Sequence, residues 1–276
     1  MEFLSFKNSK IPALGYGTWQ LRDKEGEDSI VTALGVGYRH IDTAQIYENE
    51  EAVGAGIKKS GVGRSDIFLT TKVWMDKVRD GDLQASVEGS LKKLKTDYVD
   101  LLLIHWPVKE VPFDEQLRAL QDVQKEGKTK LIGVSNFNVA QMKMVTDEIG
   151  AVIATNQVEY HPALSQKPVL DFCRAQGMFL TAYSPLARGA VDKEPVIQAI
   201  AKRHNKTSGQ VTLRWLIQQG DVAAIPKAAS RKHIEGNFAI FDFKLDDREM
   251  RDIHALARPD GRMIDPDWAP VWDKAA

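Results

Sequence analysis

The chain has 276 residues, enough for two ordinary domains or for one large α/β barrel of roughly 250 residues. It is 43% hydrophobic and 27% charged, and its net charge of -1 gives no general attraction to nucleic acid or to an anionic membrane surface. The single cysteine, Cys173, excludes an internal disulfide, and no apolar run approaches the roughly 20 residues of a membrane helix. Residues 1–7 lack the basic start and apolar core of a signal peptide, so we expect a cytoplasmic protein.

Strand and helix patterns alternate along the chain behind a short N-terminal hairpin, in which residues 4–6 and 11–13 flank a polar turn at 7–10. The expected strands are short and apolar, and they cover 14–17, 40–42, 67–72, 99–105, 131–134, 155–158, 179–183 and 222–225. The expected helices cover 28–35, 50–59, 82–94, 113–125, 139–149, 168–175, 195–203, 209–219, 232–238 and 246–256. Two of these helices, 209–219 and 246–256, are extra to an alternation of one helix after each strand.

This order predicts one α/β domain over residues 1–276: a (β/α)8 TIM barrel with an N-terminal β-hairpin and two extra helices. The strands are short and apolar throughout, as expected when both faces of a parallel sheet are covered. A doubly wound parallel sheet is the alternative. It is weakened because the run from Gly15 to Gln20 departs from G-x-G-x-x-G at its last position.

Three consecutive expected strands end in a titratable residue: Asp42, Lys72 and His105, with Tyr47 in the loop after the first. The C-terminal strand ends of a β/α barrel share one rim, so we expect the four side chains to meet there. A lysine lowers the pKa of a neighbouring phenol, a carboxylate holds the lysine charged, and a histidine can orient a carbonyl oxygen. The set suits protonation of a carbonyl oxygen while its carbon receives a hydride. Taken singly, each residue has an alternative role: Asp42 as a turn or cap residue, Lys72 as a solvated rim charge, Tyr47 as a packed loop aromatic and His105 as a core histidine.

Two motifs resemble signatures of the aldo-keto reductase family. Residues 37–44 (GYRHIDTA), followed by Glu50, match the first signature, and residues 131–137 (LIGVSNF) match the second. The similarity extends from about residue 11 to beyond residue 237. Within the family it is greatest to the short bacterial 2,5-diketo-D-gluconate and methylglyoxal reductases, because the segment after His105 is short.

The resemblance implies that Tyr47 is the general acid, that Lys72 lowers its pKa, that Asp42 pairs with Lys72 and that His105 orients the substrate. It also implies NADPH as the cofactor, bound across the barrel mouth without a Rossmann fold. The residues that fit the family's cofactor-binding positions are Thr18, Trp19, Asp42, Ser135, Asn136, Gln157, Tyr183, Ser184, Pro185, Leu186, Arg188, Ile225, Lys227, Ala228, Ser230, His233 and Asn237.

Within that set, Ser135, Asn136 and Gln157 fit the carboxamide positions, Tyr183 fits the ring that stacks on the nicotinamide, and residues 184–189 fit the loop over the pyrophosphate.

The adenosine end departs from the family pattern. Lys227 fits the lysine that faces the 2′-phosphate, but Ala228 follows it where Ser or Thr is usual, and His233 stands where Arg is usual. Histidine is largely neutral at pH 7, whereas arginine is always charged. We therefore expect NADPH to be preferred and NADH to be tolerated better than is usual in the family.

Rim tryptophans suggest an apolar wall for the substrate, although each could merely pack the barrel edge. The expected substrate-binding residues are Trp19, Tyr47, Trp74, His105, Trp106 and Trp268. Trp268 belongs to a tail, about 257–276, which by the resemblance folds over the barrel mouth. The histidines show no metal-ligand spacing, so we expect no metal.

The sequence thus predicts a monomeric NAD(P)H-dependent oxidoreductase that reduces small aldehydes, α-dicarbonyls or keto sugars to alcohols. Two alternatives stay open. A cofactor-binding regulatory or sensor protein could use the same barrel. A lyase or isomerase could use Lys72 as a Schiff base, although the carboxylate expected beside that lysine disfavours this chemistry.

Overall fold

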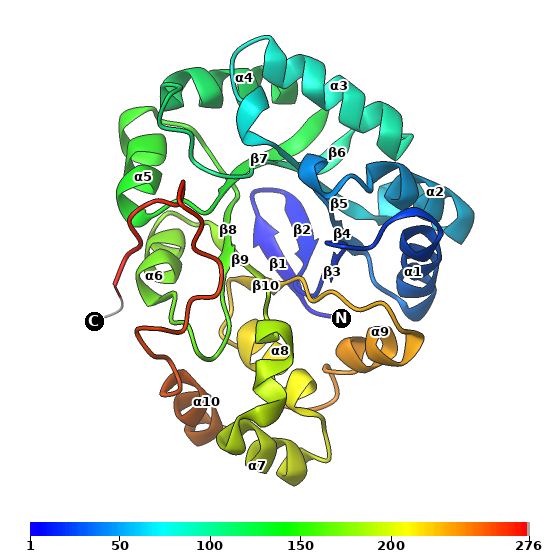
Figure 1. Cartoon of the computed structure of the whole chain (residues 1–276), viewed down its shortest axis with the longest axis vertical. Coiled ribbons are helices and arrows are strands. Elements are labelled where there is room, and N and C mark those ends of the chain that lie inside the picture. Colours follow the sequence, from blue (N-terminus) through cyan, green and yellow to red (C-terminus); the bar gives the residue numbers. More distant parts are fainter. Residues whose placement is uncertain (275–276) are drawn as a thin grey trace.

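The computed structural model describes residues 1–274 and forms a closed parallel barrel surrounded by helices (Figure 1). The eight strands of the barrel lie side by side in chain order: β3 (Tyr16–Gly17), β4 (His40–Asp42), β5 (Phe68–Val73), β6 (Val99–Ile104), β7 (Thr129–Ser135), β8 (Thr155–Glu159), β9 (Phe179–Tyr183) and β10 (Val222–Ala224). The first and last strands close the ring, since Gly15 N donates to Ala224 O at 2.8 Å and Gly17 N to Pro226 O at 3.0 Å. The predicted (β/α)8 barrel is therefore confirmed.

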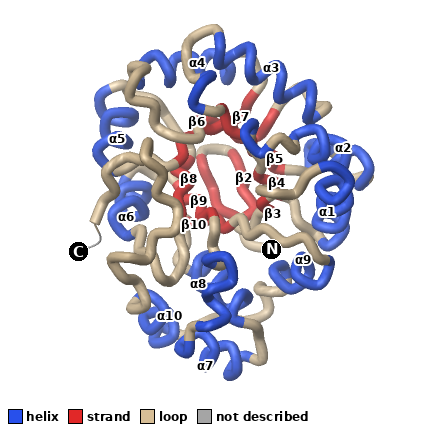
Figure 2. Tube along the Cα trace, viewed as in Figure 1, coloured by secondary structure: helices blue, strands red, loops and turns tan. Residues whose placement is uncertain are grey.

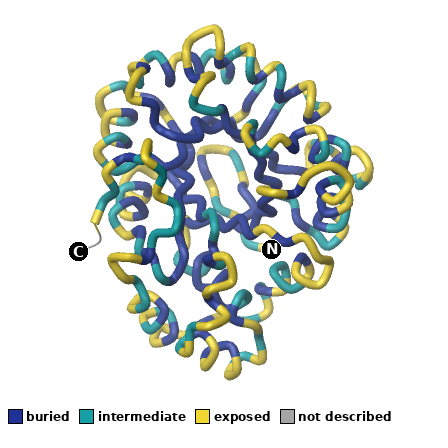
Figure 3. Tube along the Cα trace, in the orientation of Figure 1, coloured by how far each residue is buried: buried dark blue, intermediate teal, exposed yellow. Residues whose placement is uncertain are grey.

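The helices form an outer ring around the strands (Figure 2). They are α1 (Asp23–Val36), α2 (Glu50–Ser60), α3 (Asp82–Leu94), α4 (Phe113–Lys125), α5 (Val139–Lys143), α6 (Lys167–Ala175), α7 (Pro195–His204), α8 (Ser208–Gln218), α9 (Arg231–Phe238) and α10 (Asp247–His254). Each strand is covered on both faces, so the strands are buried while the outer sides of the helices are exposed (Figure 3). This double cover explains why the strands read as short apolar runs.

The N-terminal hairpin, β1 (Phe3–Phe6) and β2 (Ser9–Pro12), lies across the middle of the ring of strands in Figure 1. Phe6 and Ile11 are buried there among inward-facing strand residues such as Phe68, Leu103 and Phe179. The hairpin thus closes one end of the barrel with apolar side chains. The functional rim lies at the other end, where the strands finish.

Many element boundaries differ from the sequence prediction by one or two residues, and three differences are instructive. The hairpin turn is tighter than 7–10, because strand pairing reaches Phe6 and Ser9. Helix α1 begins at Asp23 rather than at residue 28, since its first turn is polar and carries no apolar periodicity. The expected helix 139–149 is α5 followed by a π-helical turn at Met144–Glu148, where Ile149 N donates to Met144 O at 3.0 Å.

No helix within residues 1–274 is long and apolar enough to cross a membrane.

Candidate active site

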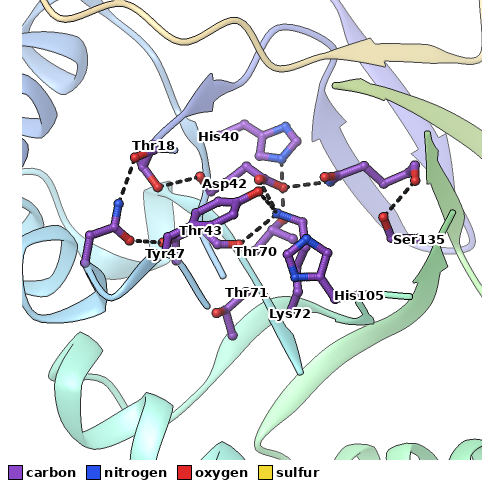
Figure 4. A network of polar contacts seen from close by, with 12 residues as sticks. Thr18, His40, Asp42, Thr43, Tyr47, Thr70, Thr71, Lys72, His105 and Ser135 are labelled. Atoms are coloured by element: carbon purple, nitrogen blue, oxygen red, sulfur yellow. Dashed lines mark hydrogen bonds and ion pairs between the residues drawn. The ribbon is translucent and has the colours of Figure 1, made fainter. Parts of the chain in front are cut away.

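Four predicted residues meet at the rim. Asp42 is the last residue of β4, Lys72 lies near the end of β5, and His105 directly follows β6. Tyr47 ends a 3₁₀ turn, Gln45–Tyr47, that follows β4. Their side chains point toward one another, with the Lys72 ammonium at the centre (Figure 4). The expectation that consecutive strand ends deliver these groups to one place agrees with the geometry.

The Lys72 ammonium is buried and its three hydrogens have three acceptors. Nζ donates to Asp42 Oδ1 at 2.5 Å, to Thr43 O at 2.9 Å and, over a longer distance of 3.4 Å, to Tyr47 Oη. The other carboxylate oxygen of Asp42 accepts from Gln157 Nε2 at 2.8 Å. Since the phenol oxygen accepts from the ammonium, the phenol's own hydrogen is left free for another acceptor.

The charges at this rim shift the pKa values of the acid and of its partner. Burial raises the pKa of Tyr47, and the positive charge of Lys72 lowers it in part. The lysine therefore acts in the expected direction, but burial outweighs it, so the net change is upward. Burial would lower the pKa of Lys72, yet the charge of Asp42 and the contacts to Asp42 and Tyr47 outweigh it and the pKa is raised. At neutral pH the arrangement is a protonated phenol beside a charged ammonium.

His105 lies between two aromatic rings, with its centroid 5.8 Å from that of Tyr47 and 5.2 Å from that of Trp74. Burial, and secondarily the charge of Lys72, holds the pKa of His105 well below its usual range. The imidazole is therefore neutral at pH 7. Its Nδ1 has no hydrogen-bond partner among the described residues. A neutral imidazole next to the phenol can give a hydrogen bond to a carbonyl oxygen.

Asp42, Tyr47, Trp74 and His105 line one cavity of about 330 Å3 at the barrel mouth, whereas Lys72 is fully buried and does not reach its surface. The residues lining it are Gly17, Thr18, Trp19, Asp42, Ile46, Tyr47, Trp74, His105, Trp106, Asn136, Gln157, Tyr183, Ser184, Pro185, Arg188, Ile225, Lys227 and Ile264. They come from both ends of the chain, as expected for a site built on the strand ends of a barrel.

Eleven of the expected cofactor-binding residues line this cavity. They are Thr18, Trp19, Asp42, Asn136, Gln157, Tyr183, Ser184, Pro185, Arg188, Ile225 and Lys227. Six do not: Ser135, Leu186, Ala228, Ser230, His233 and Asn237.

The expected carboxamide-binding residues are already hydrogen-bonded to one another and to the barrel. Ser135 Oγ is buried and donates to Gln157 O at 2.8 Å. Asn136 Nδ2 donates to His105 O and to Ser135 Oγ, while its Oδ1 accepts from Tyr183 Oη at 2.9 Å. Gln157 uses its amino group on Asp42, and its amide oxygen has no donor among residues 1–274, so it is available as an acceptor at the cavity.

The adenosine-end residues lie on and before α9. The Ser230 side chain caps this helix by accepting from His233 N at 3.3 Å. His233 and Lys227 are both exposed. Ala228 is buried, and its carbonyl oxygen accepts from the hydroxyl of Tyr16. Ser230 Oγ therefore accepts one bond as the helix cap and keeps its own hydrogen as a donor, while Lys227 presents its charge at the cavity edge.

The expected apolar wall is present, with one exception. Trp19, Trp74 and Trp106 line the cavity, but Trp268 is 49% exposed and does not. The tail residue that packs on Trp106 is Trp272, with ring centroids 6.2 Å apart, and the tail residue in the cavity wall is Ile264. Ile264 was not expected, because nothing local in a proline-rich tail distinguishes an inward-facing isoleucine.

The family profile that matches this chain is the aldo/keto reductase family, over residues 13–258. The chain belongs to the aldo/keto reductase family. It is 43% identical to methylglyoxal reductase DkgB of Escherichia coli O157:H7 over 267 residues, which cover 95% of this chain and 99% of that protein. It is 42% identical to glyoxal reductase of Bacillus subtilis (strain 168) over 259 residues, covering 94% and 93% of the two chains.

A solved structure, that of a candidate 2,5-diketo-D-gluconic acid reductase B, superposes with a TM-score of 0.97 at 49% identity and covers 99% of this chain and 98% of that one. The barrel and its hairpin are thus those of an aldo/keto reductase, and the chain is an oxidoreductase of this family. These relatives are named as reductases, which gives no support to a regulatory or sensor protein.

The Schiff-base alternative conflicts with the geometry, because the ammonium of Lys72 is raised in pKa and engaged on three acceptors. Among residues 1–274, no three His, Cys, Asp or Glu side chains gather in a way that could hold a metal ion.

Proposed function

We propose that this aldo/keto reductase uses NADPH to reduce the carbonyl group of small aldehydes, α-dicarbonyls or keto sugars to an alcohol. The observation that carries the proposal is the hydrogen bond from Lys72 Nζ to Tyr47 Oη, which leaves the phenol hydrogen free to be given to a carbonyl oxygen. The names of two relatives support the substrate class, since methylglyoxal and glyoxal are small α-dicarbonyls.

In the proposed mechanism, Tyr47 and His105 both give hydrogen bonds to the substrate oxygen. When bound, the nicotinamide supplies the hydride that the carbonyl carbon receives. The Tyr47 phenol then transfers its proton to the developing alkoxide, and the Lys72 ammonium at 3.4 Å stabilises the phenolate that remains. Asp42 keeps that ammonium charged and in place. Trp74 and Trp106 give the cavity apolar walls that exclude water.

The residues around the cavity fit a nicotinamide nucleotide. The free amide oxygen of Gln157 suits a carboxamide N–H, and the Tyr183 ring supplies an aromatic face at the same wall. Arg188 and Lys227 are exposed cations at the cavity edge, as a pyrophosphate and a 2′-phosphate would require. Arg188 lies over the Trp19 ring, 5.4 Å from its centroid, so its loop already reaches across the mouth.

Initial rates of cofactor oxidation at neutral pH, with methylglyoxal as substrate, test this proposal. Wild type should turn over, and Tyr47→Phe should lose at least about a hundredfold in kcat, the usual contribution of a positioned acid. Tyr98→Phe is the matched control: it removes a phenol oxygen just before β6, at the opposite end of the barrel, and should leave kcat unchanged. Full activity of Tyr47→Phe would refute the assigned acid, and absence of turnover in wild type would refute the reductase assignment for this substrate.

The same assay with NADH in place of NADPH tests the cofactor preference. Lys227 favours NADPH, but His233 stands where the family pattern has arginine, which is always charged and can bind phosphate through two N–H groups. We expect a preference for NADPH below about a thousandfold in kcat/KM. A larger ratio, some 4 kcal/mol, would contradict this reading of the adenosine end.

The cytoplasmic location and the monomeric state that the sequence leads us to expect stay predictions. Cell fractionation would test the location, and light scattering on the purified protein would test the monomeric state.

A further inference from the structure

A second buried carboxylate, outside the four rim residues, holds the C-terminal tail against the barrel. Glu159 is the last residue of β8 and is fully buried. Its Oε1 accepts from Met263 N and from His161 Nε2, both at 2.9 Å, and its Oε2 accepts from Ile264 N at 3.0 Å. One carboxylate therefore binds two consecutive backbone amides of the tail.

The position of this contact matters because Ile264 is the tail residue that lines the cavity of Tyr47 and His105. Its backbone amide is one of the two that Glu159 binds. The Glu159 side chain thus connects β8, which carries it, to the backbone of the cavity-wall residue Ile264. Displacement of residues 263–264 would move that wall without moving any of the strand ends.

Contacts on either side keep the tail near the rim, but they lie farther along the chain. Arg258 N donates to Ala163 O at 3.1 Å, and a Cβ on Gly261 would come within 1.8 Å of the same oxygen, so only glycine fits there. On the other side, Asn138 Nδ2 donates to Val271 O at 2.9 Å. Between these attachments, Glu159 binds both amides of the wall segment and lies 3.9 Å from the Arg262 guanidinium, while the Met263 side chain packs against the apolar core.

We propose that Glu159 is a specificity-determining positioning residue, which holds Ile264 in place as a wall of the substrate cavity. The proposal rests on the proposed reduction at this site. A carboxylate can accept all three hydrogen bonds, whereas glutamine has one carbonyl oxygen and an amino group that only donates. In Glu159→Gln at least one tail amide loses its buried acceptor, and the wall is released.

The kinetic test compares methylglyoxal with benzaldehyde, whose ring needs an apolar wall. For Glu159→Gln we expect KM for benzaldehyde to rise about tenfold, the lower end of what one methylene-sized contact contributes in an apolar pocket. KM for methylglyoxal and kcat for both should change less than about twofold, because the acid and its lysine are untouched. Equal changes for both carbonyls, or no change for benzaldehyde, would overturn the proposal.

Glu249→Gln is the matched control. Glu249 is also a buried carboxylate, which accepts from His204 Nε2 at 2.8 Å and from Asp246 N at 3.1 Å, but it joins α10 to α7 away from the cavity. If Glu249→Gln also changed the preference between methylglyoxal and benzaldehyde, the effect in Glu159→Gln would be explained by a general loss of stability, and the proposal would be overturned. Should Glu159→Gln fail to fold, Met263→Pro removes a donor from the tail side and should give the same selective rise in KM.

Limited proteolysis tests the attachment without any turnover. Trypsin can cleave the bond between Arg262 and Met263, whose nitrogen is one of the two that Glu159 holds. Glu159→Gln should be cut there at least about tenfold faster than wild type and Glu249→Gln, as read by mass spectrometry. An unchanged rate would overturn the attachment. Faster cutting in an enzyme that reduces no carbonyl would leave the attachment standing and place the failure in the proposed function.

Discussion

Replacing Lys72 by methionine should be far more costly than its small change in volume suggests. The ammonium is fully buried and Asp42 is 1% exposed, so the substitution leaves a carboxylate in the barrel without its counter-charge. Breaking a buried pair by removing one partner costs about 3–5 kcal/mol. For a domain of this size each kcal/mol lowers the melting midpoint by about 2–4 °C, so we expect a fall of about 6–20 °C.

The double variant Asp42→Asn/Lys72→Met separates charge from shape. It removes both charges, so it should recover a large part of the lost stability, although neither variant will carry an ammonium to support the Tyr47 phenolate. Both should therefore have at least about a hundredfold lower kcat. A thermodynamic cycle over the two positions should give a coupling of about 2–3 kcal/mol.

Thermal and urea unfolding measure these differences, with Lys59→Met as control. Lys59 pairs with Glu27 and Asp28 on the surface, where screening by water leaves an ion pair little net effect, so its midpoint should shift by less than about 2 °C. Two results would refute the view that the buried pair is the charged centre of this network. One is a Lys72→Met protein with the melting midpoint of wild type. The other is a double variant whose loss of stability equals the sum of the losses of the two single variants.

Two further predictions concern pH and packing. Burial and the Lys72 charge hold the pKa of His105 below that of an unfolded histidine, so the unfolded chain binds the extra proton and the free energy of unfolding must fall as pH drops below about 6.5. His105→Gln should flatten that fall by up to about 1.4 kcal/mol per pH unit in urea titrations from pH 6.5 to 5. An unaltered slope would contradict the assignment. A Cβ on Gly17 would lie 2.7 Å from Ile225 O, where the first and last strands of the barrel meet, so Gly17→Ala should lower the free energy of unfolding by about 1–3 kcal/mol. Gly35 in α1 has open space around it, so Gly35→Ala should raise that free energy by up to about 1 kcal/mol. Melting curves measure both, and the reverse order would refute the argument from close contact at Gly17.

The strand ends could be predicted from the sequence because they carry two local signals at once. An apolar run that closes on Asp42 or Lys72 marks a buried strand and also marks which of its ends leaves the core. The net pKa of Tyr47 could not be predicted in the same way, because the burial that raises it comes from elements distant in the chain. The same holds for the capping role of Ser230, which depends on where α9 begins; its hydroxyl accepts from His233 N and keeps its own hydrogen as a donor.

The tail was the least predictable part for a physical reason. Residues 255–274 form no helix or strand, so no periodicity reveals which side chains face inward. Their placement depends on contacts with the barrel, such as Trp272 against Trp106, and on contacts within the tail, such as the Arg262 guanidinium 3.7 Å from the centroid of Trp272. Trp268, in the same proline-rich tail, packs against no other aromatic ring among residues 1–274 and is exposed.

The catalytic residues on the strand ends and the wall residues in the tail are held by separate contacts, and this separation has a chemical consequence. The acid and its partners lie on strand ends in a network in which Lys72 has no spare hydrogen, so small displacements there would unpair a buried charge. In our proposal, Glu159 holds the wall formed by Ile264 through two backbone amides, which every residue type except proline supplies. Substitutions in the tail can therefore change which carbonyl compound fits while the proton donor keeps its geometry. On this proposal, substitutions at tail positions other than Gly261 can change the preferred substrate while the proton-transfer residues keep their geometry, provided that Glu159 is retained.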